Sequence, residues 1–272
     1  MKLFFLTGRG ESMKQQMFEF VSRPRISAAL SLLVVFLSLV PKCLADESDN
    51  SADLASDRVY YGVEVAPQNF PISYLEVFYS PTQVVACTGV VIDSKTILTA
   101  AHCLDDGQVY GIRVIAGGQV LAYGKLYGIH PYYIPLGFLG SWFDLGFIKL
   151  DRKLPRSVKV ASIAKKDPLP GELLTILGYG LDEFGIYNIL KAGIMQVTGS
   201  NGINTVAARP PGGGTACHGD SGGPAFIVQR KKLVVAGITS YGGPTCTADW
   251  ISFASLVHPA SKWFIKVAKR AR

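Results

Sequence analysis

The chain has 272 residues, of which 49% are hydrophobic and 17% are charged, a composition too apolar for a disordered protein. Its 29 glycines, 15 prolines, 12 tyrosines and 14 phenylalanines favour many short strands and turns over a helical bundle. The net charge is +7, but no basic stripe is interleaved with aromatic residues, so we do not expect nucleic acid as a partner.

The N-terminal region contains one long apolar run, residues 26–40. Fifteen residues are too few to span a bilayer comfortably and are typical of a secretory signal. We therefore expect a signal peptide over residues 1–45, cleaved after Ala45, and a secreted protein, extracellular or periplasmic, that is not stably inserted in a membrane. The alternative is an uncleaved anchor, because a long segment precedes the run; a start at Met13 or Met17 would shorten that segment.

An acidic segment, residues 46–58, follows the apolar run. It carries five acids and one base and has almost nothing to bury, which indicates a solvated spacer or a propeptide. Removal of residues 1–45 would also remove Cys43 and leave four cysteines. An even number in an exported protein predicts two disulfides, with three pairings open, and the spacings fit neither a zinc knuckle nor a redox pair.

The pattern of the remaining chain predicts short strands. Ten apolar runs are separated by turn residues: 75–79, 84–91, 96–100, 109–116, 145–150, 173–177, 194–197, 225–228, 233–238 and 251–254. This pattern favours an all-β sandwich or barrel. At the C-terminus, Pro259 suits a first helical position, and Trp263, Phe264 and Val267 recur at helical spacing, so we expect one terminal helix docked on the β core.

The segment 217–224, CHGDSGGP, contains a serine, Ser221, between glycines. Small neighbours can hold a hydroxyl on a tight turn and admit a substrate backbone. The core also fits the nucleophile elbow of α/β-hydrolases, which need an acid and a histidine after the serine, and Asp249 and His258 follow in that order. Only 51 residues remain after Ser221, and the preceding segment lacks alternating strands and helices, so this esterase alternative is disfavoured.

The opposite order of catalytic residues is better supported. His102 lies in the motif TAAHC, and Asp144 begins the run DLGFIKL. Together with GDSGGP, these motifs resemble the trypsin/chymotrypsin family of serine endopeptidases, whose order is His, Asp, Ser. The resemblance extends from residue 59 to about 266.

The resemblance implies a fold and a domain organisation. The fold is all-β, with two packed six-stranded antiparallel Greek-key β-barrels and a C-terminal α-helix. The protease domain would cover residues 59–272, with one barrel over about 59–160 and the other over about 161–272. It also implies the disulfides Cys87–Cys103 and Cys217–Cys246. The lack of further bridges fits a lean member of the family, and a bacterial source is compatible with it.

The resemblance also implies roles for the motif residues. Ser221 would be the nucleophile, His102 the general base and then acid, and Asp144 the group that orients the imidazole. The backbone amides of Gly219 and Ser221 would form the oxyanion hole. The substrates would be proteins or peptides, the enzyme a monomer, and neither a cofactor nor a metal is implied.

The segment 58–62, RVYYG, looks like the activation junction of this family. Cleavage after Arg58 by another protease would free the Val59 amine to pair with the Asp220 carboxylate. The alternative is a plain linker, because VYYG keeps a branched first residue and the final glycine of the usual IVGG but departs at the two positions between them.

The family also suggests which residues meet the substrate. The residue six positions before the serine is Thr215, which would lie at the base of the specificity pocket. Because Thr215 is not an acid, a preference for Lys or Arg is disfavoured, and we expect small or medium uncharged side chains. Ser240, Tyr241 and Gly242 match the segment that pairs with substrate backbone, and His218 would lie beside the substrate.

A catalytically inactive binding protein on the same fold is the main competing interpretation. Such proteins usually lose a triad residue, whereas this chain keeps all three together with both oxyanion positions. The sequence therefore favours the enzyme.

Overall fold

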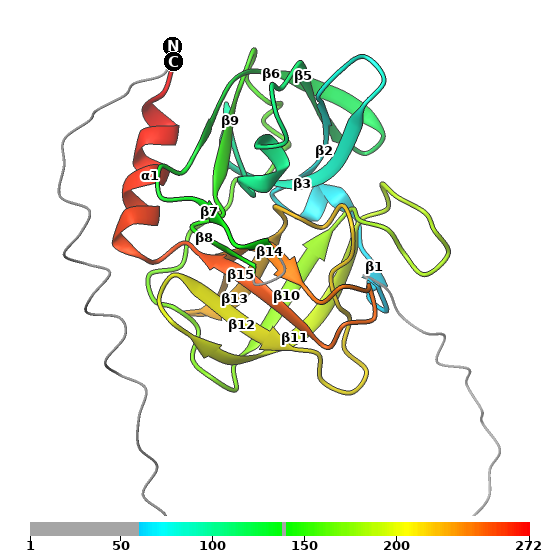
Figure 1. Ribbon diagram of the computed structural model, residues 1–272, viewed down its shortest axis with the longest axis vertical. Helices are drawn as coiled ribbons and strands as arrows, with labels where there is room; N and C mark the ends of the chain where they lie inside the picture. Colours follow the sequence, from blue (N-terminus) through cyan, green and yellow to red (C-terminus); the bar gives the residue numbers. More distant parts are fainter. Residues whose placement is uncertain (1–59, 138–139) are drawn as a thin grey trace, which may run out of the picture. The chain divides into compact units, whose positions relative to one another are not determined.

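The computed structural model describes residues 60–137 and 140–272 (Figure 1). The expected signal peptide and propeptide, and with them Arg58 and Val59, lie outside the described residues. Within those residues, none of the helices has the length and apolar character needed to cross a membrane.

Six strands close the first barrel in the order β2-β3-β4-β9-β6-β5, and every neighbouring pair is antiparallel. Their bounds are β2 Ile72–Phe78, β3 Val84–Asp93, β4 Thr96–Thr99, β5 Gly111–Ala116, β6 Gln119–Ile129 and β9 Gly146–Leu150. All residues of β4 and β9 are buried, which is why these strands appear in the sequence as continuous apolar runs.

The second barrel follows the same plan. Its order is β11-β10-β13-β14-β15-β12, closed by pairing of β11 with β12, and β1 (Val63–Glu64) is added at the edge of β11. The bounds are β10 Leu173–Gly178, β11 Lys191–Ser200, β12 Asn204–Ala208, β13 Pro224–Gln229, β14 Lys232–Gly242 and β15 Trp250–Ser255. When the strands of each barrel are numbered in chain order, both barrels close as 1-2-3-6-5-4, although the sequence shows no repeat.

The barrels share one hydrophobic core cluster. It contains Leu75 and Ile148 from the first barrel, Leu177 and Ile238 from the second, and Phe264 from the C-terminal helix. The chain passes between them where the Ala161 amide donates to the Val91 carbonyl and the Ala164 amide donates to the Val235 carbonyl. Shared burial of this kind holds the two barrels in a fixed relation, which matters because the candidate site takes residues from both.

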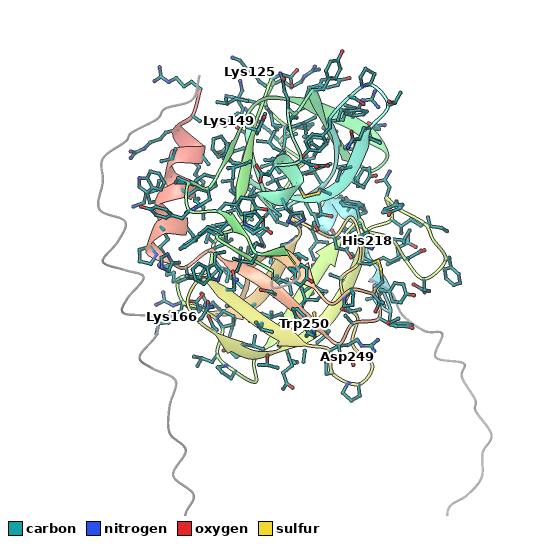
Figure 2. All side chains as sticks on the ribbon, viewed as in Figure 1. Lys125, Lys149, Lys166, His218, Asp249 and Trp250 are labelled. Atoms are coloured by element: carbon teal, nitrogen blue, oxygen red, sulfur yellow. A yellow bond between two sulfur atoms is a disulfide. The ribbon has the colours of Figure 1, made fainter. Side chains whose placement is uncertain are left out.

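The C-terminal helix α1 (Pro259–Arg270) packs back against the first barrel (Figure 1). Its buried residues are Ser261, Phe264, Ile265 and Ala268, spaced i, i+3, i+4 and i+7. Trp263 and Val267, which the sequence pattern had grouped with Phe264, are 51% and 39% exposed, because they lie beside this stripe rather than in it. Lys149 is buried beneath the helix and donates to the Lys269 carbonyl (Figure 2).

The predicted fold, two six-stranded antiparallel barrels and one terminal helix, is confirmed. The sequence pattern missed β6 and β12 in the barrels, and also β1 and the small pair β7 (Ile134–Pro135) and β8 (Ser141–Trp142). Two short 3-10 turns complete the described elements, η1 (Pro67–Asn69) and η2 (His102–Leu104).

Candidate active site

His102 is placed by a short turn that leaves the buried strand β4. It opens η2, and the next residue, Cys103, forms a disulfide with Cys87 of β3 across a Cα–Cα distance of 6.4 Å. The disulfide ties the turn to the barrel wall and adds about 3 kcal/mol in a chain-entropy estimate. The predicted pairings Cys87–Cys103 and Cys217–Cys246 are both confirmed.

Asp144 is fully buried and is the centre of a hydrogen-bond cluster. Its Oδ2 lies 2.7 Å from His102 Nδ1, and its Oδ1 accepts from the His102 backbone amide at 2.9 Å. Oδ2 also accepts from the Ser240 hydroxyl at 2.7 Å and the Ser141 hydroxyl at 3.2 Å. Since an ionised carboxylate only accepts, His102 Nδ1 carries a proton, and Nε2 is left as the basic nitrogen.

The turn that presents Asp144 is built on Phe143, whose φ of 49° lies in the left-handed region. Such a backbone costs a bulky residue about 1–3 kcal/mol unless its surroundings hold it there. The Phe143 ring stacks on His130 with 4.8 Å between centroids and an interplanar angle of 7°, and meets His258 edge-on. His258 in turn accepts from the Ala260 amide at the start of α1. This aromatic cluster connects the terminal helix to the Asp144 turn, which gives His130 and His258 structural roles.

His102 and Asp144 each shift the pKa of the other. Burial by itself would lower the pKa of His102, but the charge and hydrogen bond of Asp144 outweigh it and raise that pKa above the usual histidine value. Burial by itself would raise the pKa of Asp144, but His102 and the Ser240 hydroxyl bring it below the usual value. Asp144 therefore stays ionised at neutral pH and increases the basicity of His102.

Ser221 comes from the second barrel, on a loop held mainly by backbone hydrogen bonds. Its carbonyl accepts from the Thr88 amide at 2.8 Å, and the Gly222 amide donates to the Thr239 carbonyl at 2.8 Å. Gly222 has a φ of +85°, and a Cβ there would overlap the Thr88 carbonyl and the Thr99 hydroxyl. Only glycine fits this close approach between the serine loop and the first barrel.

Two backbone amides of this loop are available to a ligand. Among the hydrogen bonds formed within residues 60–137 and 140–272, neither the Gly219 amide nor the Ser221 amide is a donor. The Gly219 carbonyl is fixed by the Thr88 hydroxyl at 2.8 Å, and Gly219 has a φ of +96°. The loop thus presents two N–H groups without internal partners, the arrangement that can stabilise an oxyanion.

Asp220, between these two residues, points into the protein. Its Oδ1 accepts from the Gly180 amide and its Oδ2 from the Cys217 amide, both at 2.8 Å. A Cβ on Gly178 would overlap the carboxylate, and one on Gly180 would lie 2.6 Å from its Cγ. Burial raises the pKa of Asp220 to about 6.

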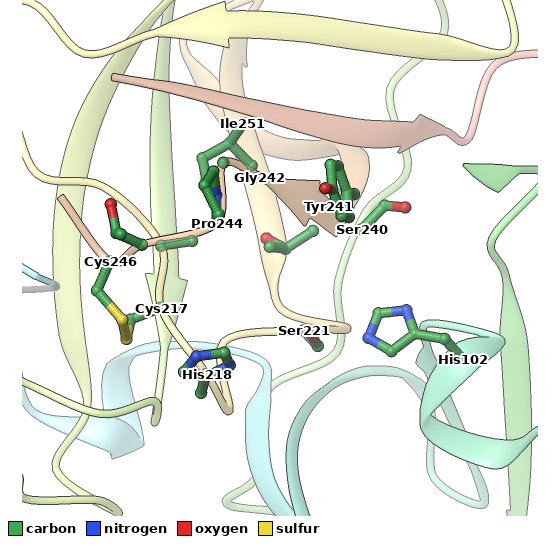
Figure 3. Close-up of a pocket in the computed structure, with 14 residues that line it drawn as sticks. His102, Cys217, His218, Ser221, Ser240, Tyr241, Gly242, Pro244, Cys246 and Ile251 are labelled. Carbon is green, nitrogen blue, oxygen red and sulfur yellow. A yellow bond between two sulfur atoms is a disulfide. The ribbon is translucent and has the colours of Figure 1, made fainter. Parts of the chain in front are cut away.

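His102 and Ser221 line one pocket of about 210 Å³, and Figure 3 shows the imidazole next to the serine. His218, Ser240, Tyr241 and Gly242 also line it. His218 is exposed at the rim, and its carbonyl accepts from the Leu181 amide. The described lining residues include no acid.

Two features of the pocket differ from the sequence-based picture. Thr215 is fully buried outside the lining, and its hydroxyl donates to the Ala248 carbonyl at 3.0 Å; Ala216 lines the pocket instead. Ile251, opposite Gly242 on the neighbouring strand, also lines the pocket. A Cβ on Gly242 would lie 2.5 Å from Ile251 Cδ1, so the isoleucine fills the space beside Gly242.

Sequence reasoning missed Ile251 and the second donor to Asp144, Ser141. The sequence also did not indicate that the hydroxyl of Ser240, a residue of the segment expected to pair with substrate backbone, binds Asp144. The motif signal of Ser240 concerns local sequence, and its partner Asp144 lies far along the chain. The described residues contain no group of three or more His, Cys, Asp or Glu side chains arranged to hold a metal.

The comparisons with known proteins agree with this geometry. The sequence model of the family described as Trypsin matches residues 60–264. Chymotrypsin of Phaedon cochleariae is 29% identical over 80% of this chain and 91% of its own. Trypsin iota of Drosophila melanogaster is 26% identical over 86% of this chain and 97% of its own, and phenoloxidase-activating factor 1 of Holotrichia diomphalia is 23% identical over 79% and 71%. The chain therefore belongs to the trypsin/chymotrypsin family of serine endopeptidases, as the order of its motifs predicted.

Proposed function

We propose that Ser221, His102 and Asp144 form the catalytic triad of a secreted endopeptidase. The observation that carries the proposal is the Asp144 cluster, which holds His102 by two hydrogen bonds in the pocket that Ser221 also lines. His102 Nε2 takes the proton of Ser221 as its Oγ attacks the scissile carbonyl, and the amides of Gly219 and Ser221 stabilise the oxyanion. His102 then protonates the leaving amine, and water hydrolyses the acyl-enzyme.

A fluorophosphonate probe tests the triad. We expect the protein beginning at Val59 to be labelled on Ser221, and labelling to disappear in Ser221→Ala but persist in Ser200→Ala, a change at an exposed serine. Because His102 acts as a base and its pKa is raised, the labelling rate should increase with pH through a value above the usual histidine pKa. An unlabelled wild-type protein would favour the inactive binding protein.

Activation by cleavage after Arg58 is part of the proposal. The Val59 amine would enter the protein and pair with Asp220, the buried carboxylate that lies between the two oxyanion residues. Support comes from its burial: a carboxylate with two amide partners and a pKa raised to about 6 gains from a cation. The activating enzyme would be another protease, since the pocket lining does not favour Arg.

The Arg58→Gln chain tests activation. We expect it to be secreted but nearly inactive, and a chain engineered to begin at Val59 should recover activity. Full activity of uncut Arg58→Gln would overturn the activation step without touching the triad. N-terminal sequencing of the secreted precursor tests cleavage after Ala45, and sedimentation tests the expected monomer.

For specificity, we propose cleavage after small or medium uncharged residues. The pocket offers no acid to a substrate cation, and Ile251 fills the space opposite Gly242. A buried Lys or Arg of the substrate would lack a counter-charge. A peptide-library profile should show uncharged residues on the acyl side of the cut, and dominance of Lys or Arg would contradict the proposal.

A further inference from the structure

Lys191 is a buried lysine, with 3% of its surface exposed, at the first position of β11. It pairs across the antiparallel ladder with Gly178 of β10. Paired residues of antiparallel strands project to the same face of the sheet. On this face, the space left by Gly178 is occupied by the Asp220 carboxylate. Lys191 and Asp220 are thus neighbours on one inner face of the second barrel.

The Lys191 ammonium has a second acidic neighbour. Its Nζ donates to Asp182 Oδ2 at 2.5 Å, and the Asp182 side chain is only 2% exposed. Asp182 Oδ1 accepts from the amides of Phe184 and Ile186 at 2.9 and 2.8 Å. The buried ion pair therefore also orders the turn that follows Asp182.

This turn is bonded directly to the serine loop. The Leu181 amide donates to the His218 carbonyl at 2.8 Å, and the Gly180 amide donates to Asp220 Oδ1 at 2.8 Å. The ring of Tyr187 packs against Gly219, with its Cε1 3.2 Å from where a Cβ would lie. Each side of Gly219 is therefore held by the segment that the Lys191–Asp182 pair anchors.

The carboxylate of Asp220 is bound by backbone amides rather than by a cation. Within the described chain, no lysine or arginine comes within ion-pair distance of it. Burial raises the pKa of Asp220, its two amide donors lower it, and Lys191 is the charged group that lowers it further. A buried carboxylate depends strongly on such a charge, because water is not there to replace it.

We propose that Lys191 is a positioning residue for catalysis. Its buried ammonium pairs with Asp182 and stabilises the charge of Asp220, and these two acids in turn fix the oxyanion amides of Gly219 and Ser221. The proposal rests on the oxyanion role assigned to these amides under the proposed function. It assigns to Lys191 a permanent charge at the site where the Val59 amine is proposed to arrive.

The proposal predicts a change in kcat rather than KM, because the amides act on the transition state. It also predicts a shift with pH. The titratable groups on the elements around this site are Lys191 of β11, Asp182 in the segment after β10, Glu64, which pairs with Lys191 from β1, and His218 of the serine loop; the last two are exposed. Loss of Lys191 raises the pKa of Asp220, so the carboxylate is protonated, and its hold on the amides weakened, at a higher pH than in wild type.

The test compares Lys191→Met with Lys149→Met in the full-length protein cut after Arg58. Lys149 is a matched control, since it is also buried and donates to Thr96 and to the end of α1 in the other barrel. We expect Lys191→Met to lose about 10- to 100-fold in kcat with KM nearly unchanged, and its acidic limb to move up by about one pH unit. Lys191→Arg, which keeps the charge, should recover part of the loss.

A second variant keeps the test informative if Lys191→Met folds poorly. In Lys191→Met/Asp182→Asn the ion pair is removed as a whole, which buried pairs tolerate better than the loss of one partner. Thermal unfolding should show that this variant is folded, and its acidic limb should still be shifted, because Asp220 lacks the buried charge of Lys191 that acts beside the Val59 amine. An unshifted limb and kcat equal to Lys149→Met would overturn the role of Lys191, whereas an inactive wild-type enzyme would overturn the proposed function and this inference with it.

Discussion

The two halves of the candidate active site are held by different kinds of contact. The first barrel supplies His102 and Asp144, and side-chain hydrogen bonds converge there on one carboxylate. The second barrel supplies Ser221, on a loop held by backbone hydrogen bonds and by glycines that allow close approach. Substitutions in the first half should therefore change the charge and pKa of the base, whereas substitutions in the second should displace amides.

The buried acids show the same contrast. Asp144 has a cationic partner when His102 is protonated, two hydroxyl donors and an amide, and its pKa lies below the usual value. Asp220 has two amides and the more distant charge of Lys191, and its pKa is raised to about 6. The ionised form of Asp144 is already stabilised by its neighbours, whereas the ionised form of Asp220 would be stabilised further by a cation. The half of the site that holds Ser221 is therefore the half that can respond to the arrival of a cation at Asp220.

The largest expected effect comes from Asp144→Asn. Asp144 accepts through both oxygens, Oδ1 from the His102 backbone amide and Oδ2 from the His102 ring and the serine hydroxyls, whereas asparagine has only one acceptor oxygen. One set of donors would therefore face the amide NH2 group, and the imidazole loses its orientation and its favoured tautomer. We expect kcat to fall about 10⁴-fold, the size known for this change in the trypsin family. Steady-state kinetics would check it, with Asp249→Asn, an exposed acid paired with Arg209, as control. Retention of a tenth of wild-type kcat would contradict the role of Asp144.

The second-largest expected effect comes from a change next to the loop that carries Ser221. In Gly180→Ala, the new Cβ would lie 2.6 Å from Asp220 Cγ and 2.7 Å from its amide nitrogen, so the serine loop must move. We expect kcat to fall about 100-fold, the cost of one lost oxyanion donor, and the free energy of unfolding to fall by about 1–3 kcal/mol. Gly199→Ala, where a Cβ has open space, is the matched control and should change neither quantity. Equal kcat and equal free energy of unfolding in the two variants would contradict the argument that Asp220 packs too closely on Gly180 for a side chain to fit.

The fold could be predicted from the sequence where strands are buried and apolar. All ten predicted runs overlap observed strands, including β4 and β9. β6 was missed because Gly124 interrupts its pattern, although a Cβ there would lie 2.9 Å from Ile112 Cβ and only glycine fits. β12 was missed because its buried positions are the small residues Thr205 and Ala207. Close packing at a barrel wall requires small residues, and these carry little hydrophobic signal.

The site could be predicted only as far as its motifs extend. His102, Asp144 and Ser221 each lie in a short recognisable segment, whereas the supporting contacts join distant positions. Ser240 is 96 residues from Asp144. Lys191, at the start of β11, is only nine residues from Asp182, but the loop between them contains no motif. Such contacts depend on strand register and barrel closure, which local patterns do not specify.

Ser240→Ala tests how much of the first half depends on a single hydroxyl. The change removes a 2.7 Å hydrogen bond to an ionised carboxylate, so the pKa of Asp144 should rise. The more basic carboxylate should raise the pKa of His102 further, while it is fixed in place by one donor fewer. We expect kcat to fall about 10- to 100-fold, with activity on the acidic side lost at a higher pH than in wild type. Ser141→Ala removes the longer 3.2 Å bond and should have the smaller effect in the same pH–rate profile. A larger effect of Ser141→Ala than of Ser240→Ala would show that the length of the hydrogen bond to Asp144 does not determine its importance.

The smallest expected effect is in the pocket, where Ile251→Val removes one methylene from the wall opposite Gly242. A methylene in an apolar pocket is worth about 1–3 kcal/mol of discrimination at most, and partial closure of the new space reduces this. We expect kcat/KM to shift by about three- to tenfold toward larger apolar side chains on the acyl side of the cut. Ile227→Val, also buried in the second barrel but outside the pocket lining, controls for the stability cost of about 0.5–1.5 kcal/mol. If both variants leave the peptide profile unchanged, Ile251 does not limit the pocket, and the preference must be set by the other lining residues.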